Sequence, residues 1–355
     1  MDNTRDKESL FGKTISELKE ITEKLALPKF AAKQMAQWLY DKKISSIDEM
    51  TNLSKDARKK LNKQYKIGVS EAQSVKISTD GTKKYLFATQ NNKYIETAYI
   101  PEEKRNTLCV SSQVGCKMAC TFCMTGKQGF QNNLTAGEIL NQLRSIPESN
   151  EVSNIVFMGM GEPFDNLTEV LKALEILTAD YGFAMSPKRI TVSSIGVIKS
   201  LQEFLEKSNC HLAISLHTPF DDERLKLMPI QKTQPIKKVL EIIRNWEFGR
   251  QRRVSFEYIM FKGVNDSPQH VKELARILNG IKCRINLIRF HQVPGIDIKG
   301  SDDATIFEFQ RLLKAKGIVT TIRASRGQDI EAACGLLSTK KILEEQKIKV
   351  KNIST

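Results

Sequence analysis

Three closely spaced cysteines have the residue type and the spacing of metal ligands. Cys116, Cys120 and Cys123 form a C-x3-C-x2-C pattern that can bring three thiolates onto one loop. Iron–sulfur clusters are held by cysteine sulfur, and three ligands to a [4Fe–4S] cluster leave one iron free to bind a small molecule. Reductive cleavage of S-adenosylmethionine (SAM) needs such an iron. The alternative is a zinc site, but structural zinc sites usually close with four ligands, and no second cysteine pair follows here.

Other polar residues stand at the ends of expected strands. Gly161-Glu162-Pro163 offers a glycine backbone and a carboxylate, which together can hold an ammonium group. Ser193 and Ser215-Leu216-His217 end the next two expected strands. Hydroxyl groups at such positions, and Gly-Glu-Pro itself, most often form ordinary turns. Cys334, between Ala333 and Gly335, would by itself be a small buried hydrophobic residue.

An alternation of apolar and helical stretches must position these residues. Expected strands cover 108–111, 154–159, 189–194, 211–216, 254–260, 284–288 and 319–323, and expected helices cover 167–178, 236–246, 267–278 and 304–315. This order is typical of a parallel sheet with helices outside. Six to seven β/α units are too few for a closed eightfold barrel. The pattern therefore predicts an α/β fold with a partial barrel, open on one side to a large substrate.

Two smaller segments precede this core. Residues 1–70 contain three expected helices, at 15–25, 30–40 and 54–65, and the first begins at the capping-box pattern Thr14-Ile15-Ser16-Glu17. Residues 71–101 are expected to form a β-hairpin linker around the turn signal Asp80-Gly81. We expect a helical accessory domain at 1–70, this linker, a core domain at 102–337 and a basic tail at 338–355. The accessory domain is expected to bind RNA, and the alternative is a basic solvated face on an ordinary helical bundle.

The composition narrows the class of protein. A net charge of +14 over 355 residues favours polyanionic partners, and the cluster Arg250, Arg252 and Arg253 is either a phosphate contact or a solvated loop. We find no apolar run long enough to span a membrane and no signal peptide at the start, so we expect a cytoplasmic protein. Seven cysteines in such a chain indicate metal or redox chemistry rather than a disulfide framework.

Longer motifs resemble the RlmN/Cfr family of RNA adenine methyltransferases, within the radical-SAM superfamily. They are Cys109-Val110-Ser111-Ser112-Gln113-Val114-Gly115-Cys116, Met158-Gly159-Met160-Gly161-Glu162-Pro163 and Asp329-Ile330-Glu331-Ala332-Ala333-Cys334-Gly335. The resemblance runs from about Asn92 to Leu337. It implies the partial radical-SAM barrel, a [4Fe–4S] cluster on Cys116, Cys120 and Cys123, and SAM contacts from Gly161, Glu162, Ser193, Ser215, Leu216, His217 and His291. His291 stands where the family pattern has Asn, and either residue can hydrogen-bond a ribose hydroxyl or adenine.

The resemblance also implies that Cys334 carries the methyl group. Adenine C2 has no lone pair to attack a methyl sulfonium, whereas a thiolate is a good nucleophile. In this scheme Cys334 takes a methyl group from one SAM. A second SAM, cleaved at the cluster, gives a radical that removes hydrogen from that methyl, and the resulting carbon radical adds to C2. Cys109 then releases the product through a transient disulfide with Cys334, and Glu96 accepts the C2 proton.

The implied activity is methylation of C2 of adenosine 2503 in 23S rRNA, in the peptidyl-transferase centre, and of adenosine 37 in tRNA. Each turnover is expected to use two SAM and a reductant such as flavodoxin or ferredoxin. We also expect a monomer that does not associate with a membrane. One alternative is a Cfr-type enzyme that methylates C8 of the same rRNA base, although the Cfr pattern has Gly-Glu-Ala in place of Gly161-Glu162-Pro163. The other is a non-catalytic iron–sulfur or zinc RNA-binding module, which would not require Cys109, Glu96 and Cys334 together.

Overall fold

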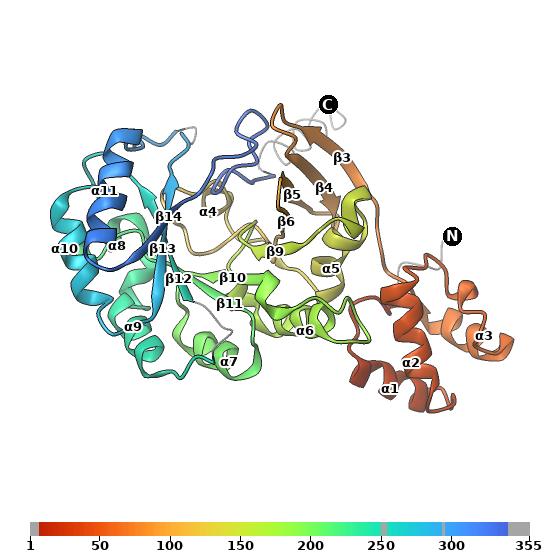
Figure 1. Cartoon of the computed structure of the whole chain (residues 1–355). Helices are drawn as coiled ribbons and strands as arrows, with labels where there is room; N and C mark the ends of the chain where they lie inside the picture. Colours follow the sequence, from red (N-terminus) through yellow and green to blue (C-terminus); the bar gives the residue numbers. More distant parts are fainter. Residues whose placement is uncertain (1–6, 250–253, 293–294, 340–355) are drawn as a thin grey trace, which may run out of the picture.

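A curved sheet with helices on its outer face forms the centre of the molecule (Figure 1). The computed structural model describes residues 7–249, 254–292 and 295–339. Within these residues the large sheet has 10 strands, in the order β14-β13-β12-β11-β10-β9-β6-β5-β4-β3. Its parallel strands are β6 (Arg105–Cys109), β9 (Asn154–Phe157), β10 (Ile190–Ser194), β11 (His211–Ser215), β12 (Val254–Met260), β13 (Cys283–Arg289) and β14 (Val319–Ile322). The expected partial barrel of an α/β fold is confirmed.

Helices cover the outside of this barrel because each has one apolar face. α6 (Leu167–Thr178), α9 (Ile236–Asn245), α10 (Pro268–Ile277) and α11 (Asp303–Ala315) follow the expected ranges closely. In α9, for example, Val239, Leu240 and Ile243 are buried against the sheet core. The helices α4 (Met124–Gln128), α5 (Ala136–Arg144), α7 (Ile198–Lys207) and α8 (Asp221–Leu227) were not predicted from the sequence.

The segment before the barrel extends the same sheet. β3 (Ala72–Ile77), β4 (Lys83–Ala88) and β5 (Tyr94–Glu102) pair antiparallel, and β5 pairs in turn with β6 through Ala98 and Cys109. The turn signal is correct, since Gly81 takes a positive φ of 83° between β3 and β4. Residues expected to form a linker are therefore built into the core sheet. Two short strands, β7 (Gln113–Val114) and β8 (Asn132–Asn133), pair nearby.

The first part of the chain forms a small helical unit beside α5 and α6 (Figure 1). It contains α1 (Ile15–Lys24), α2 (Ala31–Ala36), which continues as a π turn at Gln37–Asp41, and α3 (Lys55–Gln64), with β1 (Glu8–Ser9) and β2 (Tyr65–Lys66) paired at its edge. Thr14 and Glu17 form the predicted capping box of α1. Glu17 also accepts from Lys172 at 2.8 Å, which joins the unit to the core.

The segment after β14 crosses the open side of the barrel (Figure 1). The amide of Gly327 donates to Asp80 at 2.9 Å, Ser78 donates to Asp329 at 2.5 Å, and Thr125 donates to the carbonyl of Leu337 at 2.6 Å. These bonds tie residues 327–337 to the β3–β4 turn on one side and to α4 on the other, so Cys334 is held across the opening. Of the described helices, none has the length and apolarity to cross a bilayer.

Candidate active site

The three motif cysteines line one cavity at the carboxyl ends of the strands. Cys116 follows β7, and Cys123 directly precedes α4, with its amide donating to the carbonyl of Cys120 at 3.2 Å. The cavity measures about 150 Å³ and is also lined by Met158, Glu162 and Cys334. Enzymes built on β/α barrels have their active sites at the carboxyl ends of the strands.

The donor set fits a cluster better than a single metal ion. Burial raises the pKa of Cys116 to about 12 and also raises the pKa values of Cys120 and Cys123, so these thiolates need a nearby cation. Within residues 7–249, 254–292 and 295–339, no three metal-ligating side chains converge on one point. A [4Fe–4S] cluster takes each thiolate on a separate iron, and three cysteines around one cavity suit that requirement.

Gly161 and Glu162 lie on the wall of the same cavity. Gly161 has a φ of +100°, and a Cβ there would lie 2.6 Å from the Cβ of Gln113, so the position requires glycine. The Glu162 carboxylate accepts the amides of Phe164 and Ile195 at 3.0 and 3.1 Å. Burial raises the pKa of Glu162 to about 7. A neighbouring ammonium group would restore its charged form, which fits the amino group of SAM.

The remaining residues expected to contact SAM divide into two groups. Ser193, Ser215 and His217 line the small cavity. Burial lowers the pKa of His217 to about 3, and its Nδ1 accepts the amide of Ile259 at 3.1 Å, so the neutral ring carries its proton on Nε2. The side chain of Leu216 is fully buried in the core, which leaves only its backbone for a contact. His291 lines a second, larger cavity instead.

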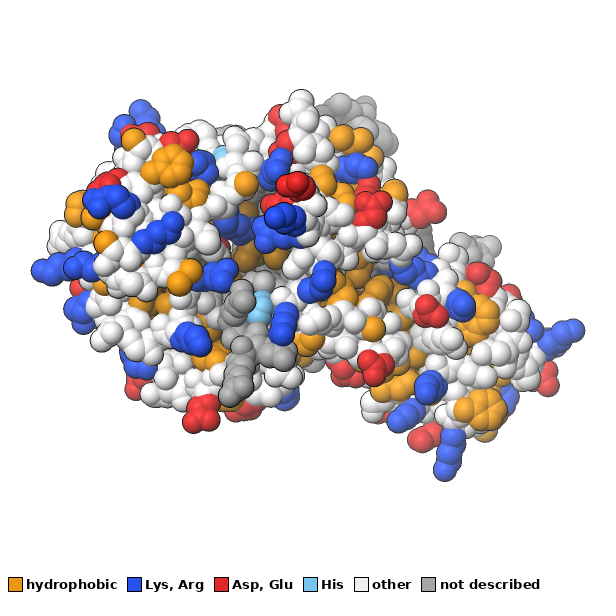
Figure 2. Space-filling view, viewed as in Figure 1, with side chains coloured by type: hydrophobic (Ala, Val, Ile, Leu, Met, Phe, Trp, Pro, Cys, Tyr) orange, Lys and Arg blue, Asp and Glu red, His pale blue; other side chains and the backbone are white. Residues whose placement is uncertain are grey.

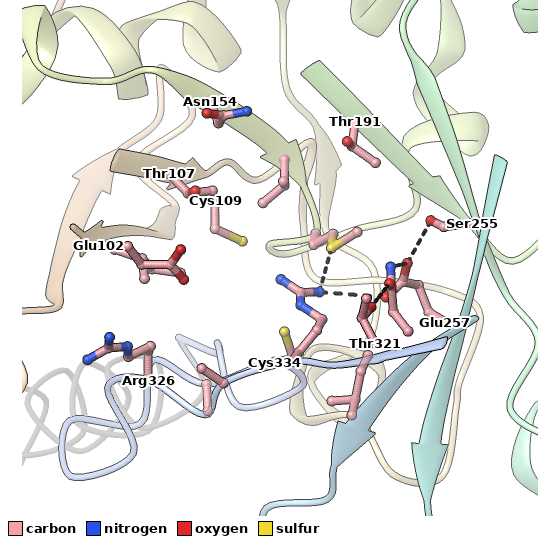
Figure 3. Close-up of a pocket in the computed structure, with 18 of the residues that line it drawn as sticks. Glu102, Thr107, Cys109, Asn154, Thr191, Ser255, Glu257, Thr321, Arg326 and Cys334 are labelled. Carbon is pink, nitrogen blue, oxygen red and sulfur yellow. Dashed lines mark hydrogen bonds and ion pairs between the residues drawn. The ribbon is translucent and has the colours of Figure 1, made fainter. Parts of the chain in front are cut away.

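This larger cavity, of about 580 Å³, fills the inside of the barrel and is lined by Cys109 and Cys334. Cys109 comes from β6 and Cys334 from the segment after β14, and their sulfur atoms face the same space (Figure 3). Both are free thiols, so the structure contains no disulfide between them. Burial raises the pKa of Cys109 to about 12. A thiolate at this position therefore forms only with help from a nearby positive charge, and the charge of Arg323 lowers the pKa of Cys109.

The two cavities meet at Cys334. Six residues line both: Met158, Glu257, Ile288, Arg323, Cys334 and Leu337. One side of Cys334 thus faces the cavity with the three cysteines, and the other faces the barrel interior. A group carried on this sulfur can be received on one side and delivered on the other.

Glu96 is missing from the described residues that line the two cavities. Its carboxylate forms a buried ion pair with Lys84 at 3.0 Å and accepts the amide of Ser338 at 3.0 Å. Lys84 also donates to the carbonyl of Glu331 at 3.3 Å. Burial raises the pKa of Glu96, whereas Lys84 lowers it. The pair therefore fastens the chain on both sides of Cys334 to β4 and β5.

We expect Lys84→Met to loosen this attachment. Removing one partner of a buried ion pair typically costs about 3–5 kcal/mol of stability, because the other charge stays buried and uncompensated. The measurement is the free energy of unfolding by urea, together with protease cleavage between residues 326 and 339. Lys84→Met/Glu96→Gln should recover part of the loss, since it removes both charges. Equal stability of Lys84→Met and the unaltered chain would contradict this assignment.

The large cavity has a basic mouth at the amino ends of the strands. Its lining contains six basic residues, Arg105, Lys188, Arg189, Arg284, Arg323 and Arg326, against two acidic ones, Glu102 and Glu257. Figure 2 shows lysine and arginine side chains around a hollow in the middle of this face. The cluster Arg250, Arg252 and Arg253 and the basic tail from residue 340 lie outside the described residues.

Sequence reasoning missed Glu257 and Arg323, which stand where the cavities meet. A signal for Glu257 was available, because it is a single acid within the otherwise uncharged strand Val254–Met260. Acids are rarely buried without a partner. Arg323 ends the last expected strand and gave no comparable signal.

Comparisons with known proteins agree along nearly the whole chain. Residues 110–276 match the radical SAM superfamily, and residues 9–67 match the ribosomal RNA large subunit methyltransferase N-terminal domain. The probable dual-specificity RNA methyltransferase RlmN of Phocaeicola vulgatus is 57% identical, over 96% of this chain and 97% of the relative. The dual-specificity RNA methyltransferase RlmN of Syntrophus aciditrophicus is 42% identical, over 94% and 97%. A solved radical SAM methyltransferase from Sphaerobacter thermophilus superposes with a TM-score of 0.86 at 37% identity, over 93% of this chain and 99% of that structure.

Proposed function

The chain belongs to the RlmN family of radical-SAM RNA methyltransferases, and from this premise we propose that it methylates C2 of adenosine in 23S rRNA and tRNA. The sites are adenosine 2503 of the rRNA and adenosine 37 of tRNA. As a member of the radical SAM superfamily, the chain uses a [4Fe–4S] cluster and SAM. The observation that carries the proposal is the position of Cys334, which borders both cavities and shares the larger one with Cys109.

The residues of the small cavity are proposed to hold the two cofactors. Cys116, Cys120 and Cys123 bind the cluster. Gly161, Glu162, Ser193, Ser215, His217 and the backbone of Leu216 hold SAM, and His291 reaches it from the larger cavity. Bound there, the cofactors supply a methyl donor and, with an electron from flavodoxin or ferredoxin, a hydrogen-abstracting radical. Two SAM are consumed in each turnover.

Two cysteines then carry the group to the base. Cys334 accepts the methyl group on sulfur, where thiolate nucleophilicity makes displacement feasible, and later presents it as a carbon radical to adenine C2. The adduct radical gives back one electron to the redox centre and loses its C2 proton. The Cys109 thiolate then attacks the Cys334 sulfur, which forms a disulfide, and the released carbon takes up a proton to become the methyl group on the base. Both sulfur atoms face one space, as this exchange requires (Figure 3).

Glu96 is proposed as the acceptor of the C2 proton. A base with a burial-raised pKa is suited to this task. Its carboxylate is held by Lys84 and the Ser338 amide, behind the segment that carries Cys334. The proposal therefore requires this segment to shift when the adduct forms, so that the carboxylate reaches the base.

The target base is proposed to enter through the basic mouth at the amino ends of the strands. An enzyme that acts on a base inside folded RNA needs it unpaired or flipped out. Four basic side chains at the amino ends of the strands suit the surrounding phosphates, namely Arg105, Lys188, Arg189 and Arg284. Such substrates place the reaction in the cytoplasm, and we take the active species to be a monomer. Residues 1–70 are proposed to form an RNA-binding domain ahead of the sheet extension at 71–101, the core at 102–337 and the tail at 338–355.

We expect the exposed lysine stripe of α3 to contribute to RNA affinity. Lys55, Lys59 and Lys63 lie four residues apart, so they share one face of the helix. Replacing all three by Glu should weaken binding, and the slope of log affinity against log salt should fall by about 0.9 for each phosphate that the variant no longer neutralises. Fluorescence anisotropy with a labelled tRNA anticodon stem-loop measures both.

The matched control is Lys272→Glu/Lys314→Glu/Lys316→Glu. All three lysines are exposed. Lys272 lies on α10, and Lys314 and Lys316 lie at the end of α11, on the side of the barrel far from α3 (Figure 1). This variant changes net charge by the same amount, so it should retain the salt slope of the unaltered chain. Equal weakening by both variants would assign the N-terminal unit a structural role only.

The function is tested by mass spectrometry of nucleosides. Deletion of the gene should remove 2-methyladenosine from 23S rRNA and tRNA, and the purified, reconstituted enzyme should restore it. Appearance of 8-methyladenosine would favour the Cfr-type reaction. The sequence argues against that reaction, because it has Gly161-Glu162-Pro163 where the Cfr pattern has Gly-Glu-Ala. An RNA-binding module without catalysis would restore neither nucleoside.

A further inference from the structure

Glu257 is a buried acid inside the barrel that the proposed reaction does not use. It lies in the middle of β12, is 3% exposed, and lines both cavities. Buried acids are rare unless paired. Glu257 and Cys334 both line the two cavities, so Glu257 borders the space where the target base would lie.

One oxygen of this carboxylate is held firmly in place. Oε1 accepts from Ser255 Oγ at 2.9 Å and from Asn286 Nδ2 at 2.7 Å. Asn286 is fixed in turn, because its Oδ1 accepts from Thr321 Oγ1 at 2.6 Å. The chain of bonds crosses β12, β13 and β14 (Figure 3). The orientation of the Glu257 carboxylate is thus set before any substrate binds.

The other oxygen has no hydrogen-bond donor among the described residues. Oε2 is buried and accepts no hydrogen bond from these residues. Arg323 Nη1 lies 3.7 Å away, beyond hydrogen-bond distance, and donates instead to the sulfur of Met158 at 3.0 Å. The arginine offsets the charge without occupying the acceptor. A buried, pre-oriented acceptor without a donor is the exception in native structures, and here it borders a cavity large enough for a nucleoside.

We propose that Glu257 Oε2 accepts a hydrogen bond from the exocyclic amino group of the target adenine, so that Glu257 selects adenine over other purines. The inference rests on the proposed function. The chemistry at C2 does not distinguish adenine from hypoxanthine, because both carry hydrogen on a carbon between two ring nitrogens. They differ at position 6, where adenine has an amino donor and hypoxanthine a carbonyl acceptor. A carboxylate oxygen accepts from the first and repels the second.

Guanine needs no such discrimination, since an amino group already occupies its C2. A hydroxyl of the SAM ribose is a second donor of the same kind, because Glu257 also borders the small cavity. The experiment must therefore separate recognition of the target base from binding of SAM.

The test uses RNA stem-loops that carry adenosine, purine riboside or inosine at the target position. Purine riboside lacks the amino group, and inosine replaces it with a carbonyl. The reconstituted enzyme and its Glu257→Gln and Glu257→Ala variants are compared by kcat/KM for each RNA, and by RNA affinity from anisotropy. Comparing ratios between enzymes cancels the intrinsic reactivity of each base.

The unaltered enzyme should prefer adenosine to purine riboside by about 10- to 100-fold, the range for one hydrogen bond to a charged group. In Glu257→Ala this preference should fall towards one. Glu257→Gln should raise the inosine-to-adenosine ratio by about 10-fold or more, because its amide can donate to the carbonyl. Thr191→Val, in the same cavity on β10, should leave both ratios unchanged (Figure 3).

Two results would overturn the inference. If the Glu257 variants lose activity equally on all three RNAs, the residue is structural. If methylation of Cys334 in the absence of RNA is lost, Glu257 serves SAM. Failure of the unaltered enzyme to methylate the adenosine RNA would contradict the proposed function instead, and the affinity ratios would still test Glu257.

Discussion

Replacement of Cys116, Cys120 or Cys123 by alanine, one at a time, is expected to remove bound iron and reduce SAM cleavage to background. In the proposed cluster each cysteine supplies the thiolate for a different iron, and the three line one cavity. Burial raises the pKa values of all three, so the two that remain would be protonated thiols without iron to stabilise their charge. Anaerobic purification, iron and sulfide analysis, the visible spectrum and the yield of 5′-deoxyadenosine measure the effect.

Cys283→Ala is the matched control. Cys283 begins β13 and is not among the described residues that line either cavity. This variant should keep the iron content and the SAM cleavage of the unaltered chain. Full SAM cleavage in any variant that lacks the cluster would end the hypothesis that these cysteines hold it.

Replacement of Cys334 and of Cys109 should have different consequences. Cys334→Ala lacks the proposed methyl acceptor, so it should never acquire a protein-bound methyl and should leave RNA unmodified. Cys109→Ala keeps the proposed acceptor but lacks the thiolate proposed to release the product. It should form the adduct and then stall, as a covalent protein–RNA species through Cys334.

A denaturing gel and mass spectrometry of the digested adduct distinguish these outcomes. Digestion should place the RNA on the peptide that contains Cys334. Glu96→Gln should also retain adduct, since loss of the C2 proton precedes release. Normal turnover by Cys109→Ala, or methylation of adenine by Cys334→Ala, would require direct methyl transfer to be reconsidered.

Much of the barrel could be predicted because its elements carry local signals. The strand Val254–Met260 and the helix Leu167–Thr178 are observed with the predicted bounds, since buried parallel strands and amphipathic helices leave clear apolar patterns. The linker prediction for residues 71–101 missed the pairing of β5 with β6. β5 and β6 are joined by a two-residue turn at Glu103-Lys104. This turn lacks the Asn-Gly or Asp-Gly signal that made the β3–β4 turn predictable.

The site was predictable only where residues and motifs are distinctive. The cysteine spacing indicated the cluster, and the longer motifs indicated roles for Cys109 and Cys334. The hydrogen bond between Ser338 and Glu96 joins residues that are 242 positions apart, so no sequence pattern indicated it. The same holds for the bonds among Glu257, Asn286 and Thr321. These pairings follow from strand order and from the path of the last segment across the barrel.

Isotope transfer from SAM with a fully deuterated methyl group tests the account most directly. If Cys334 carries the methyl group, one deuterium is removed before the carbon adds to adenine, and a proton takes its place on release. We therefore expect 2-methyladenosine in which the new methyl group keeps two of the three deuterium atoms. A methyl group that keeps all three, or one attached at C8, would contradict the account.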